Sequence, residues 1–355
     1  MKEEILNFIV CPICKQGFDL KIFDTEDGEV KSGVLVCICG QFFPVVNYIP
    51  RIITGDLRPM LYDQFSDFFK DHKDKIPQEK VGVIGELGSQ KKRETSESFA
   101  YEWQKFSKMI NEWKDNFDFY FQPVSNKNKF LNDKNVLEVG CGKGRHTFYI
   151  ADIAKNVIAV DFGRAVDVAL LNNKNKKNIH FIQADIYNLP FKNNSFDFVF
   201  SLGVLHHLPT PEQGFKKLVD LLRNGGGILV YVYHSFPKTT FKYYLLRFVN
   251  FFRNFTTRIS HDLLYILCYP IAFFSYIIFV LPYKLFFKKI IKNGWPLGLY
   301  SNYPFEVLLN DTFDRFSAPI ENRYSKEQIE KWYQNSGLKE IVVLGGGGWR
   351  IFGVK

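Results

Sequence analysis

The chain has 355 residues, of which 46% are hydrophobic and 23% are charged. At roughly 150 residues per domain this length predicts about two domains, and the composition excludes a disordered or coiled-coil protein as the main state. The net charge of +9 would suit an anionic partner, so its distribution along the chain matters. The first residues are acidic and lack the basic and apolar regions of a secretory signal, so we expect a cytoplasmic protein.

Four of the six cysteines lie close together near the start of the chain. In a reducing compartment such a cluster is typical of a metal site, with reduced or redox-active thiols as the alternative. Four thiolates can surround Zn²⁺, and the ion would supply folding energy that a segment of about 50 residues gains poorly from its own core. The pairs have the spacings C-x-x-C and C-x-C, and their members are Cys11, Cys14, Cys37 and Cys39.

The segment that follows, Gly40 to Arg51, reads GQFFPVVNYIPR. It resembles the zinc-ribbon tail of the small activator subunit of tRNA methyltransferases, which also stands at the front of many bacterial methyltransferases. Two departures from that pattern are Tyr48 in place of a glycine and the shortened C-x-C pair. The resemblance covers residues 8 to 53 and implies a zinc ribbon, whose closed four-cysteine site would serve structure or docking.

The stretch 54–95 alternates charges with little apolar periodicity, and we expect a linker there. A helix is predicted to begin after it, with Thr95 or Ser96 as the cap. Phe99 and Trp103 share one face of that helix by their spacing. This face either packs on the next domain or, by resemblance to a similar stretch in the same methyltransferases, closes over a cofactor pocket.

A short apolar strand at 135–139 runs into a glycine-rich turn and then a helix. Such a turn lets the backbone approach a ligand closely. Arg145 stands where a dinucleotide fingerprint needs its third glycine or alanine, which disfavours a nicotinamide cofactor. Further strands alternate with helices, which predicts a parallel sheet with the ligand at the carboxyl ends of its strands. They are expected at 156–161, 180–185, 195–201 and 227–233.

In this order the features resemble the successive motifs of class I methyltransferases of the type 11 family, which use S-adenosylmethionine. The resemblance covers about residues 130–235 and resumes near 320, and it implies a Rossmann-like α/β fold with a seven-stranded, mostly parallel sheet. It also implies residues for the methionine part, the ribose hydroxyls, the adenine edge and the pocket wall. In that order they are Glu138 with Gly140, Gly142 and Gly144; Asp161; Asp185 with Ile186; and Leu202.

Methyl transfer from a sulfonium needs mainly proximity and alignment, plus a base where the nucleophile is a hydroxyl or an amine. Histidine titrates near neutrality and is the natural candidate for that base. His206 and His207 follow the fourth strand, and His234 follows the fifth. Because the His-His pair is also a structural feature of the resembled family, a packing role stays open for it.

An extra segment separates the fifth strand from a final helix and strand pair. Within it, residues 241–292 hold eight basic residues against one acid, and 263–283 is a run of 21 residues without a charge. That run is long enough to cross a bilayer, but a single crossing would part the last strands from their sheet, and Pro270 and Pro282 predict broken helices. We expect an interfacial segment on an anionic membrane surface, or a soluble cap or dimer interface, or, less favoured, an RNA contact.

These features predict a methyltransferase that acts on a small amphipathic or lipid-linked acceptor and is attached peripherally to a membrane. The first alternative is a zinc-ribbon rRNA or tRNA methyltransferase, which is less favoured because the positive charge lies among aromatic residues. The second alternative is a non-catalytic adapter. Asp311 and Asp314, in a D-x-x-D-x-x-x-P stretch that resembles the ribbon-bearing methyltransferases, face the pocket or cap a helix. The expected parts are a ribbon (1–53), a linker (54–95), front helices (96–130), the core (131–235), the insertion (236–318) and the end of the core (319–355).

Overall fold

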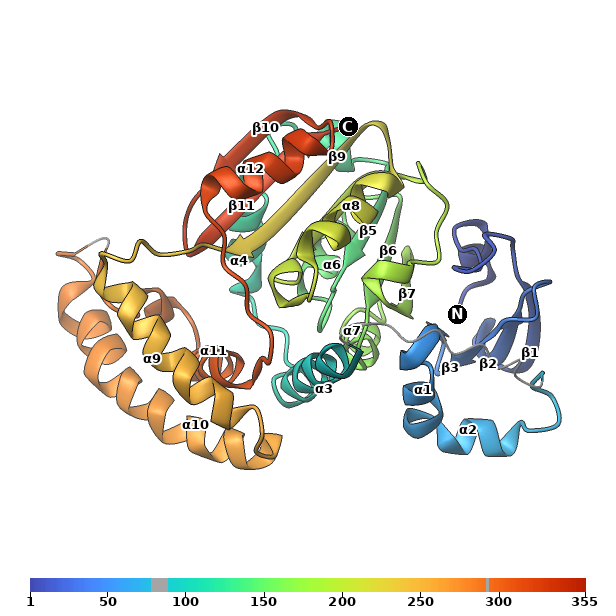
Figure 1. The fold of residues 1–355 in the computed structure, drawn as a ribbon, viewed down its shortest axis with the longest axis horizontal. Coiled ribbons are helices and arrows are strands. Elements are labelled where there is room, and N and C mark those ends of the chain that lie inside the picture. Colours follow the sequence, from blue (N-terminus) through green and yellow to red (C-terminus); the bar gives the residue numbers. More distant parts are fainter. Residues whose placement is uncertain (78–88, 292–293) are drawn as a thin grey trace.

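A mostly parallel sheet of seven strands forms the centre of the computed structural model, which describes residues 1–77, 89–291 and 294–355 (Figure 1). Across the sheet the strands are β7 (Ile179–Ala184), β6 (Asn156–Asp161), β5 (Asn135–Val139), β8 (Phe196–Leu202), β9 (Leu222–Tyr233), β11 (Gly348–Val354) and β10 (Lys339–Leu344). The first five are parallel, and β11 and β10 complete the sheet in antiparallel fashion. The predicted class I methyltransferase architecture is confirmed.

Helices cover both faces of this sheet, because successive side chains of a strand point to opposite sides. Leu137 packs in one apolar cluster with Phe215 and Trp332, while its neighbour Val136 packs in another with Phe121. The last helix begins at a capping box in which Ser325 accepts from the Gln328 amide. The first face carries α8 (Pro211–Leu221) and α12 (Lys326–Asn335), and the second carries α4 (Trp113–Tyr120), α5 (Lys127–Leu131), α6 (Arg145–Ile150) and α7 (Ala165–Asn172). Short 3₁₀ turns are η3 (Ile186–Asn188) and η4 (Leu205–His207).

The N-terminal domain joins the central sheet directly. Its last strand pairs in parallel with β7, so that Arg51 lies opposite Gln183 and Ile52 opposite Ala184. One continuous sheet of eleven strands results. The sequence did not predict this junction, because the residues of a four-residue strand do not indicate which sheet edge the strand pairs with. The domain consists of η1 (Glu3–Asn7), β1 (Asp19–Glu26), β2 (Glu29–Val36), β3 (Phe42–Val46) and β4 (Ile49–Ile52).

The prediction of a linker at 54–95 is wrong in the part that the structure describes. Short helices follow the ribbon, and Leu57, Leu61 and Phe68 form a buried cluster with Val46. Their apolar spacing was hidden among charged residues. The glycine-rich part of the predicted linker, 81–88, lies outside the described residues, as do residues 78–80. The helices are η2 (Gly55–Leu57), α1 (Pro59–Gln64), α2 (Ser66–Asp71) and α3 (Ser89–Lys105).

The insertion after β9 is helical. Its longest helix is continuous over His261–Phe287, so the prediction that Pro270 and Pro282 break the chain into separate helices is wrong. Wide π turns lie on both sides of Pro282, and such turns accommodate a residue that has no amide hydrogen to donate. The elements are α9 (Phe241–Thr256), α10 (His261–Ser275), η5 (Tyr276–Val280), η6 (Tyr283–Phe287), η7 (Gly298–Asn302) and α11 (Phe305–Ser317).

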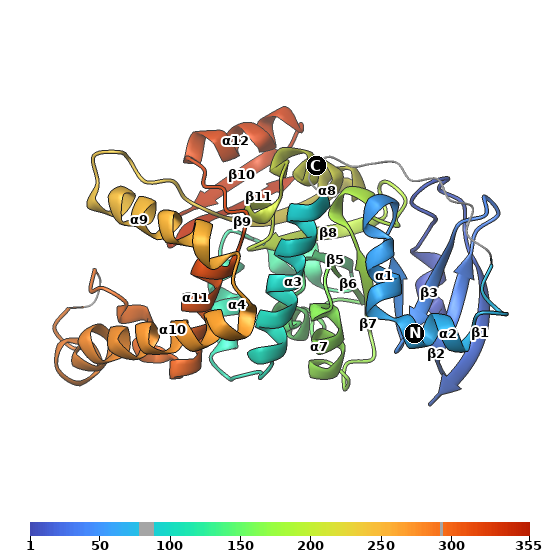
Figure 2. The ribbon, with the colours of Figure 1, turned by 60° about the horizontal axis from the view of Figure 1, so that its bottom comes forward.

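The α11 helix returns the chain from the insertion to the core. Leu264, Cys268 and Ala272 of α10 pack against Leu308 and Phe313 of α11. On its other side α11 lies against α3, and both helices lie below the sheet in Figure 1. The ribbon and the insertion therefore sit at opposite ends of the sheet, with α3 between them (Figures 1 and 2).

Candidate cofactor site and cysteine cluster

The glycine-rich turn after β5 forms the floor of a pocket at the carboxyl ends of the parallel strands. Gly140 has φ +82°, and a Cβ there would stand 2.1 Å from a Val204 methyl carbon. No other residue type fits this position without moving the loop after β8. The turn ends at Gly144, which precedes α6.

Asp161, at the end of β6, is held by the same turn. Its carboxylate accepts hydrogen bonds from the backbone N–H groups of Gly142 (2.8 Å) and Gly163 (2.9 Å). Burial nevertheless raises the pKa of Asp161 to about 6, against the lowering effect of these bonds. A carboxylate so placed can accept further hydrogen bonds from hydroxyl groups in the pocket.

Asp185 and Ile186 follow β7 and line the pocket next to Asp161. The Asp185 carboxylate pairs with the ammonium group of Lys92 at 2.8 Å, and both side chains are buried. The Lys92 ammonium also lies 4.6 Å from the centre of the Tyr187 ring. Lys92 was missed in the sequence because it belongs to the stretch predicted as a linker.

Two of the predicted cofactor residues lie behind the pocket wall. Glu138 is buried beneath the turn, where it accepts a hydrogen bond from the Thr147 hydroxyl, and burial raises its pKa to about 8. Gly144 faces Asn173 and Ala169 of α7, where an added Cβ would collide. These two residues shape the turn, whereas the other predicted cofactor residues line the pocket: Gly140, Gly142, Asp161, Asp185, Ile186 and Leu202.

The α3 helix closes the pocket from the front. Phe99 and Trp103 line it, in the position expected of a helix that covers the cofactor. Thr95 and Ser96 also line it and stand inside the helix, so the prediction that one of them caps the helix is wrong. Lys143, in the glycine turn, lies 5.4 Å from the Trp103 ring, and burial lowers its pKa to about 7.

The three candidate histidines occupy different environments. His207 lines the pocket, and its Nδ1 lies 2.6 Å from the Ile320 carbonyl. His206 is fully buried with its ring 3.9 Å from that of Tyr233, and burial lowers its pKa well below the usual value. His234 is half-buried beside Phe236 and does not line the pocket. The geometry thus brings His207 alone of the three to the cofactor pocket.

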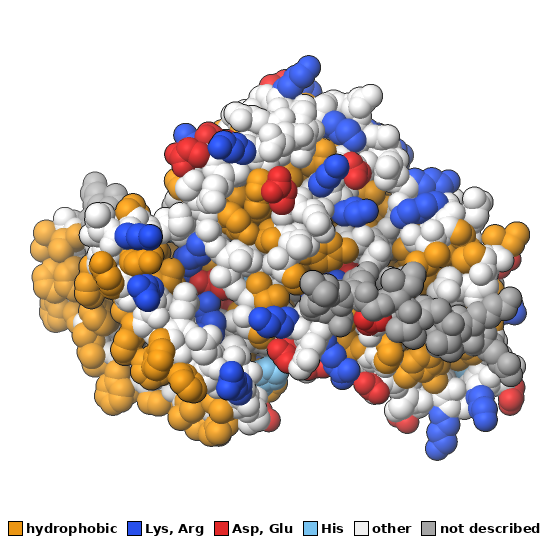
Figure 3. All heavy atoms as spheres, in the orientation of Figure 1, with side chains coloured by type: hydrophobic (Ala, Val, Ile, Leu, Met, Phe, Trp, Pro, Cys, Tyr) orange, Lys and Arg blue, Asp and Glu red, His pale blue; other side chains and the backbone are white. Residues whose placement is uncertain are grey.

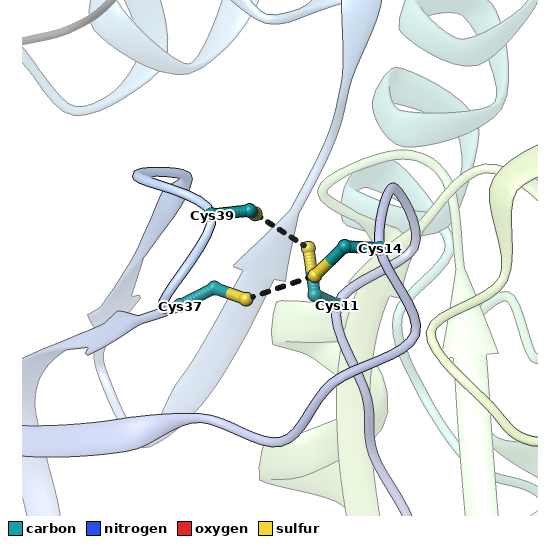
Figure 4. Close-up of side chains that lie close together, drawn as sticks. All are labelled: Cys11, Cys14, Cys37 and Cys39. Atoms are coloured by element: carbon teal, nitrogen blue, oxygen red, sulfur yellow. Dashed lines mark hydrogen bonds between the residues drawn. The ribbon is translucent and has the colours of Figure 1, made fainter.

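The four N-terminal cysteines converge as the sequence predicted (Figure 4). Their sulfur atoms all lie within 4.8 Å of one another, with Cys11 and Cys39 at 3.7 Å and Cys14 and Cys37 at 3.2 Å. Zn–S bonds of about 2.3 Å in a tetrahedron place sulfurs about 3.8 Å apart, whereas a disulfide needs about 2 Å. The donor set therefore fits a structural Zn²⁺, and the shortened C-x-C pair does not prevent the fourth thiol from joining.

Comparisons with known proteins agree with this arrangement. Residues 137–230 match the methyltransferase domain family, and residues 2–47 match the Trm112p-like protein family. A tRNA U34 carboxymethyltransferase of Aliarcobacter butzleri is 32% identical over 124 residues, which are 34% of this chain and 40% of that protein. The enzyme of the same name from Shewanella halifaxensis is 35% identical over 105 residues, 28% of this chain and 32% of that protein. The chain thus spans well under half the length of these curated relatives.

The chain also matches solved structures, at low sequence identity and low TM-score. The complex of the Haloferax volcanii Trm112 methyltransferase activator with a methyltransferase covers 73% of this chain and 97% of its own, with a TM-score of 0.41 and 12% identity. A SAM-dependent methyltransferase from Aquifex aeolicus covers 72% of this chain and 96% of its own, with a TM-score of 0.39 and 13% identity. The two family matches thus identify a Trm112p-like segment at residues 2–47 and a methyltransferase domain at residues 137–230, and the observed sheet has the class I, S-adenosylmethionine-dependent fold.

Proposed function

We propose that this protein transfers a methyl group from S-adenosylmethionine to an acceptor. The observation that carries the proposal is the assembly of Asp161, Asp185 and the glycine turn around one pocket at the carboxyl ends of the strands. Carboxylates there suit the ribose hydroxyls and the adenine amino group, and Ile186 and Leu202 suit the flat ring. The bound cofactor supplies an already activated methyl group, so the residues of the chain need to bind, orient and exclude water.

The names of the curated relatives favour a nucleic-acid acceptor over the small amphipathic acceptor that the sequence put first. Both quoted relatives are tRNA U34 carboxymethyltransferases. The similarity covers about a third of this chain, and the match of 137–230 to the methyltransferase domain covers about a quarter, which holds the cofactor turn and both strand-end acids. A tRNA acceptor is therefore the first candidate, supported through the cofactor-binding part of the chain.

A second candidate, a lipid-linked acceptor, is supported by the surface of the insertion. Of the 25 large apolar side chains that are exposed in the described part of the chain, 21 lie between residues 241 and 299. Figure 3 shows them as a broad field over α9 and α10 with scattered basic groups. Phe241 is 79% exposed and Phe248 62%, and water contact of so many rings opposes solubility. The comparisons give this candidate no support, and it rests on the insertion alone.

The charges of the insertion favour an anionic lipid surface as the partner of that field. Lys284, Lys288 and Lys289 are exposed next to it, and each basic residue near such a surface contributes about 1 kcal/mol. Arg253, by contrast, is buried in an ion pair with Glu321 at 2.7 Å, so it does not contribute to the positive charge of the surface. Lys292, which the sequence counted with them, lies outside the described residues.

One helix of the insertion, His261–Phe287, is long and apolar enough to cross a membrane, with 22% of its most apolar window buried. One such helix is weak support for a crossing. Because α11 packs along it and leads back to β11 through α12, we propose that the helix lies in the interface rather than across the bilayer.

A labelling experiment separates the acceptor classes. Purified protein and methyl-labelled S-adenosylmethionine are added to a methyl-depleted cell extract, which is then separated into RNA, organic-soluble, protein and small aqueous fractions. Label in RNA supports the tRNA acceptor, and label in the organic fraction supports the lipid-linked acceptor. Failure of the protein to bind S-adenosylhomocysteine in calorimetry would instead favour a non-catalytic adapter and overturn the proposed function.

A further inference from the structure

A group of acidic side chains lies beside the cofactor pocket, on the side that faces the insertion. Glu102 belongs to α3, next to the pocket residue Trp103, and is 2% exposed. Asp311 and Asp314 lie in the middle of α11, so they do not cap that helix, and neither of them lines the cofactor pocket. A hydrogen bond of 3.3 Å from the Ser98 hydroxyl to the Ser317 carbonyl ties the two helices together.

The tyrosines around this group satisfy only part of its hydrogen-bonding capacity. The Tyr300 hydroxyl donates to Asp311 at 2.6 Å, and the Tyr233 hydroxyl donates to Asp314 at 3.2 Å. Oε2 of Glu102 and Oδ1 of Asp314 are shielded from water and have no hydrogen-bond partner among the described residues. A buried carboxylate oxygen without a donor is costly, so these two oxygens point to a donor that a ligand brings.

The position of the group matches that of an acceptor. Tyr231 and Tyr233 stand at the carboxyl end of β9, and His206 lies against the Tyr233 ring. Burial raises the pKa of Asp314, and the nearby His207, which lines the cofactor pocket, opposes part of that rise, so His207 lies close to both sites. In an open α/β sheet ligands bind at this edge of the strands. Glu102, Asp311 and Asp314 do not themselves line the cofactor pocket, but Trp103, the chain neighbour of Glu102, and His207, which lies close to Asp314, do line it.

We propose that Glu102 and Asp314 form the acceptor subsite and bind a hydroxyl or amine group by accepting its hydrogen. This inference rests on the proposed function. Three carboxylates at one place attract a hydrogen-bond donor and repel a phosphate or carboxylate, so the reacting group is uncharged or cationic even where the rest of the acceptor is anionic. Burial, together with Asp314 and Asp311, raises the pKa of Glu102 well above the usual range, which makes its carboxylate a stronger base.

The transfer balances with these groups alone. The acceptor oxygen or nitrogen forms a bond to the methyl carbon, the carbon–sulfur bond breaks, and its electron pair stays on sulfur in S-adenosylhomocysteine. The proton leaving the acceptor passes to the carboxylate of Glu102 or Asp314. No oxidant, reductant or metal is needed.

The test compares Glu102→Gln and Asp314→Asn with wild type in two assays. Calorimetry with S-adenosylhomocysteine reports the cofactor site, and label transfer from saturating S-adenosylmethionine into the methyl-depleted extract reports the acceptor site. We expect cofactor affinity within about twofold of wild type and transfer reduced about 100-fold, the range of a lost general base. Glu97→Gln, on the exposed face of the same helix, should change neither.

The pH profile separates binding chemistry from a structural role. Because the ionised carboxylate accepts the proton, the wild-type transfer rate should rise with pH through the raised pKa of Glu102, and Glu102→Gln should lose that rise. Unchanged transfer in both variants, with cofactor binding retained, would overturn the inference and leave the proposed function standing. If a circular dichroism melt shows that one variant is unfolded, the transfer rate of the other variant still tests the inference. Loss of cofactor binding by the wild type would overturn the proposed function itself.

Discussion

The ribbon and the insertion are both additions to the same sheet, and they treat apolar residues in opposite ways. The ribbon extends the sheet through β4 and buries Phe42, Phe43 and Ile49 almost completely. The insertion buries one narrow stripe, including Leu264 and Cys268, against α11 and leaves the rest of its apolar surface in water. An added segment that buries its apolar side chains against the sheet forms part of the domain. An added segment that leaves a large apolar surface exposed is typical of an interaction site. Changes in the ribbon, in the insertion and in the pocket between them should therefore have different effects on folding and on binding.

The largest effect should follow the loss of the metal ligands. Cys11→Ser removes one of the four thiols, and structural Zn²⁺ contributes about 10–16 kcal/mol in small zinc domains. We expect loss of bound zinc, measured by atomic emission, and unfolding of residues 1–53, measured by hydrogen exchange. Cys268→Ala, at a cysteine far from the cluster, should keep its zinc. A zinc content unchanged in Cys11→Ser would contradict the four-cysteine site.

The junction between ribbon and sheet should depend on Arg51. Its fully buried guanidinium donates to Asp167 of α7 at 2.5 Å, to Gln183 at 3.1 Å and to the Val46 carbonyl at 3.1 Å. Removing one partner of a buried ion pair costs about 3–5 kcal/mol, so Arg51→Ala should lower the free energy of unfolding by that amount in urea. Arg93→Ala, which removes an exposed pair, should cost under about 1 kcal/mol. Equal costs would show that the ribbon is only loosely joined.

The exposed apolar side chains of the insertion should contribute little to the stability of the fold and much to binding of membranes. Replacing Phe248, Phe251 and Phe252 by serine removes exposed rings, so the melting temperature should stay within a few degrees. Binding to vesicles of phosphatidylglycerol and phosphatidylcholine, measured by flotation, should fall by at least about tenfold, since each buried ring contributes about 1.5–3 kcal/mol.

Charge provides the matched control for that experiment. Lys288→Gln with Lys289→Gln should weaken binding to anionic vesicles by about 2 kcal/mol and leave binding to neutral vesicles unchanged. If the wild-type protein does not bind vesicles and light scattering shows that it forms dimers, the exposed apolar side chains of the insertion bind a second copy of the chain. Strong, salt-dependent binding to tRNA that the lysine variant loses would assign the basic residues to RNA.

The smallest effect concerns the pocket between the two additions, which neither set of changes should disturb. The pKa of Asp161 is raised to about 6, and its ionised form is the better acceptor for ribose hydroxyls. The affinity for S-adenosylhomocysteine should therefore increase with pH up to about 6, by at most about tenfold per unit, and level off above it. Asp161→Asn should bind more weakly and lose this dependence in calorimetry. If the affinity of the wild type for S-adenosylhomocysteine does not depend on pH, Asp161 does not bind the ribose hydroxyls.

The same ionisation affects stability in the opposite direction. A carboxyl whose pKa is raised on folding binds its proton more tightly in the folded state, so its contribution falls as pH rises from about 4 toward 6. Without the cofactor, Asp161→Asn should therefore be at least as stable as wild type at pH 7.

Much of the site was readable from the order of motifs. The strand ends carrying Asp161 and Asp185 and the turn at Gly140 fall where the sequence placed them, because regular alternation of strand and helix brings the carboxyl ends of parallel strands to one edge of the sheet. Glu138 and Gly144 were placed on the right turn but lie behind its wall. Lys92, which lines the pocket, and Glu102, which lies beside it, could not be found, since only tertiary packing brings α3 to the pocket.

The sequence alone determined the cysteine cluster, the succession of strands along the chain and the polar ends of the strands, because these follow from local spacing and the period of apolar residues. It also located the apolar and basic insertion. Only the tertiary structure decided that β4 pairs with β7, that Arg253 is buried against Glu321, and that Glu102 meets Asp314. Each of these joins segments far apart in sequence, and the free energy that selects them comes from burial and pairing that no local pattern records.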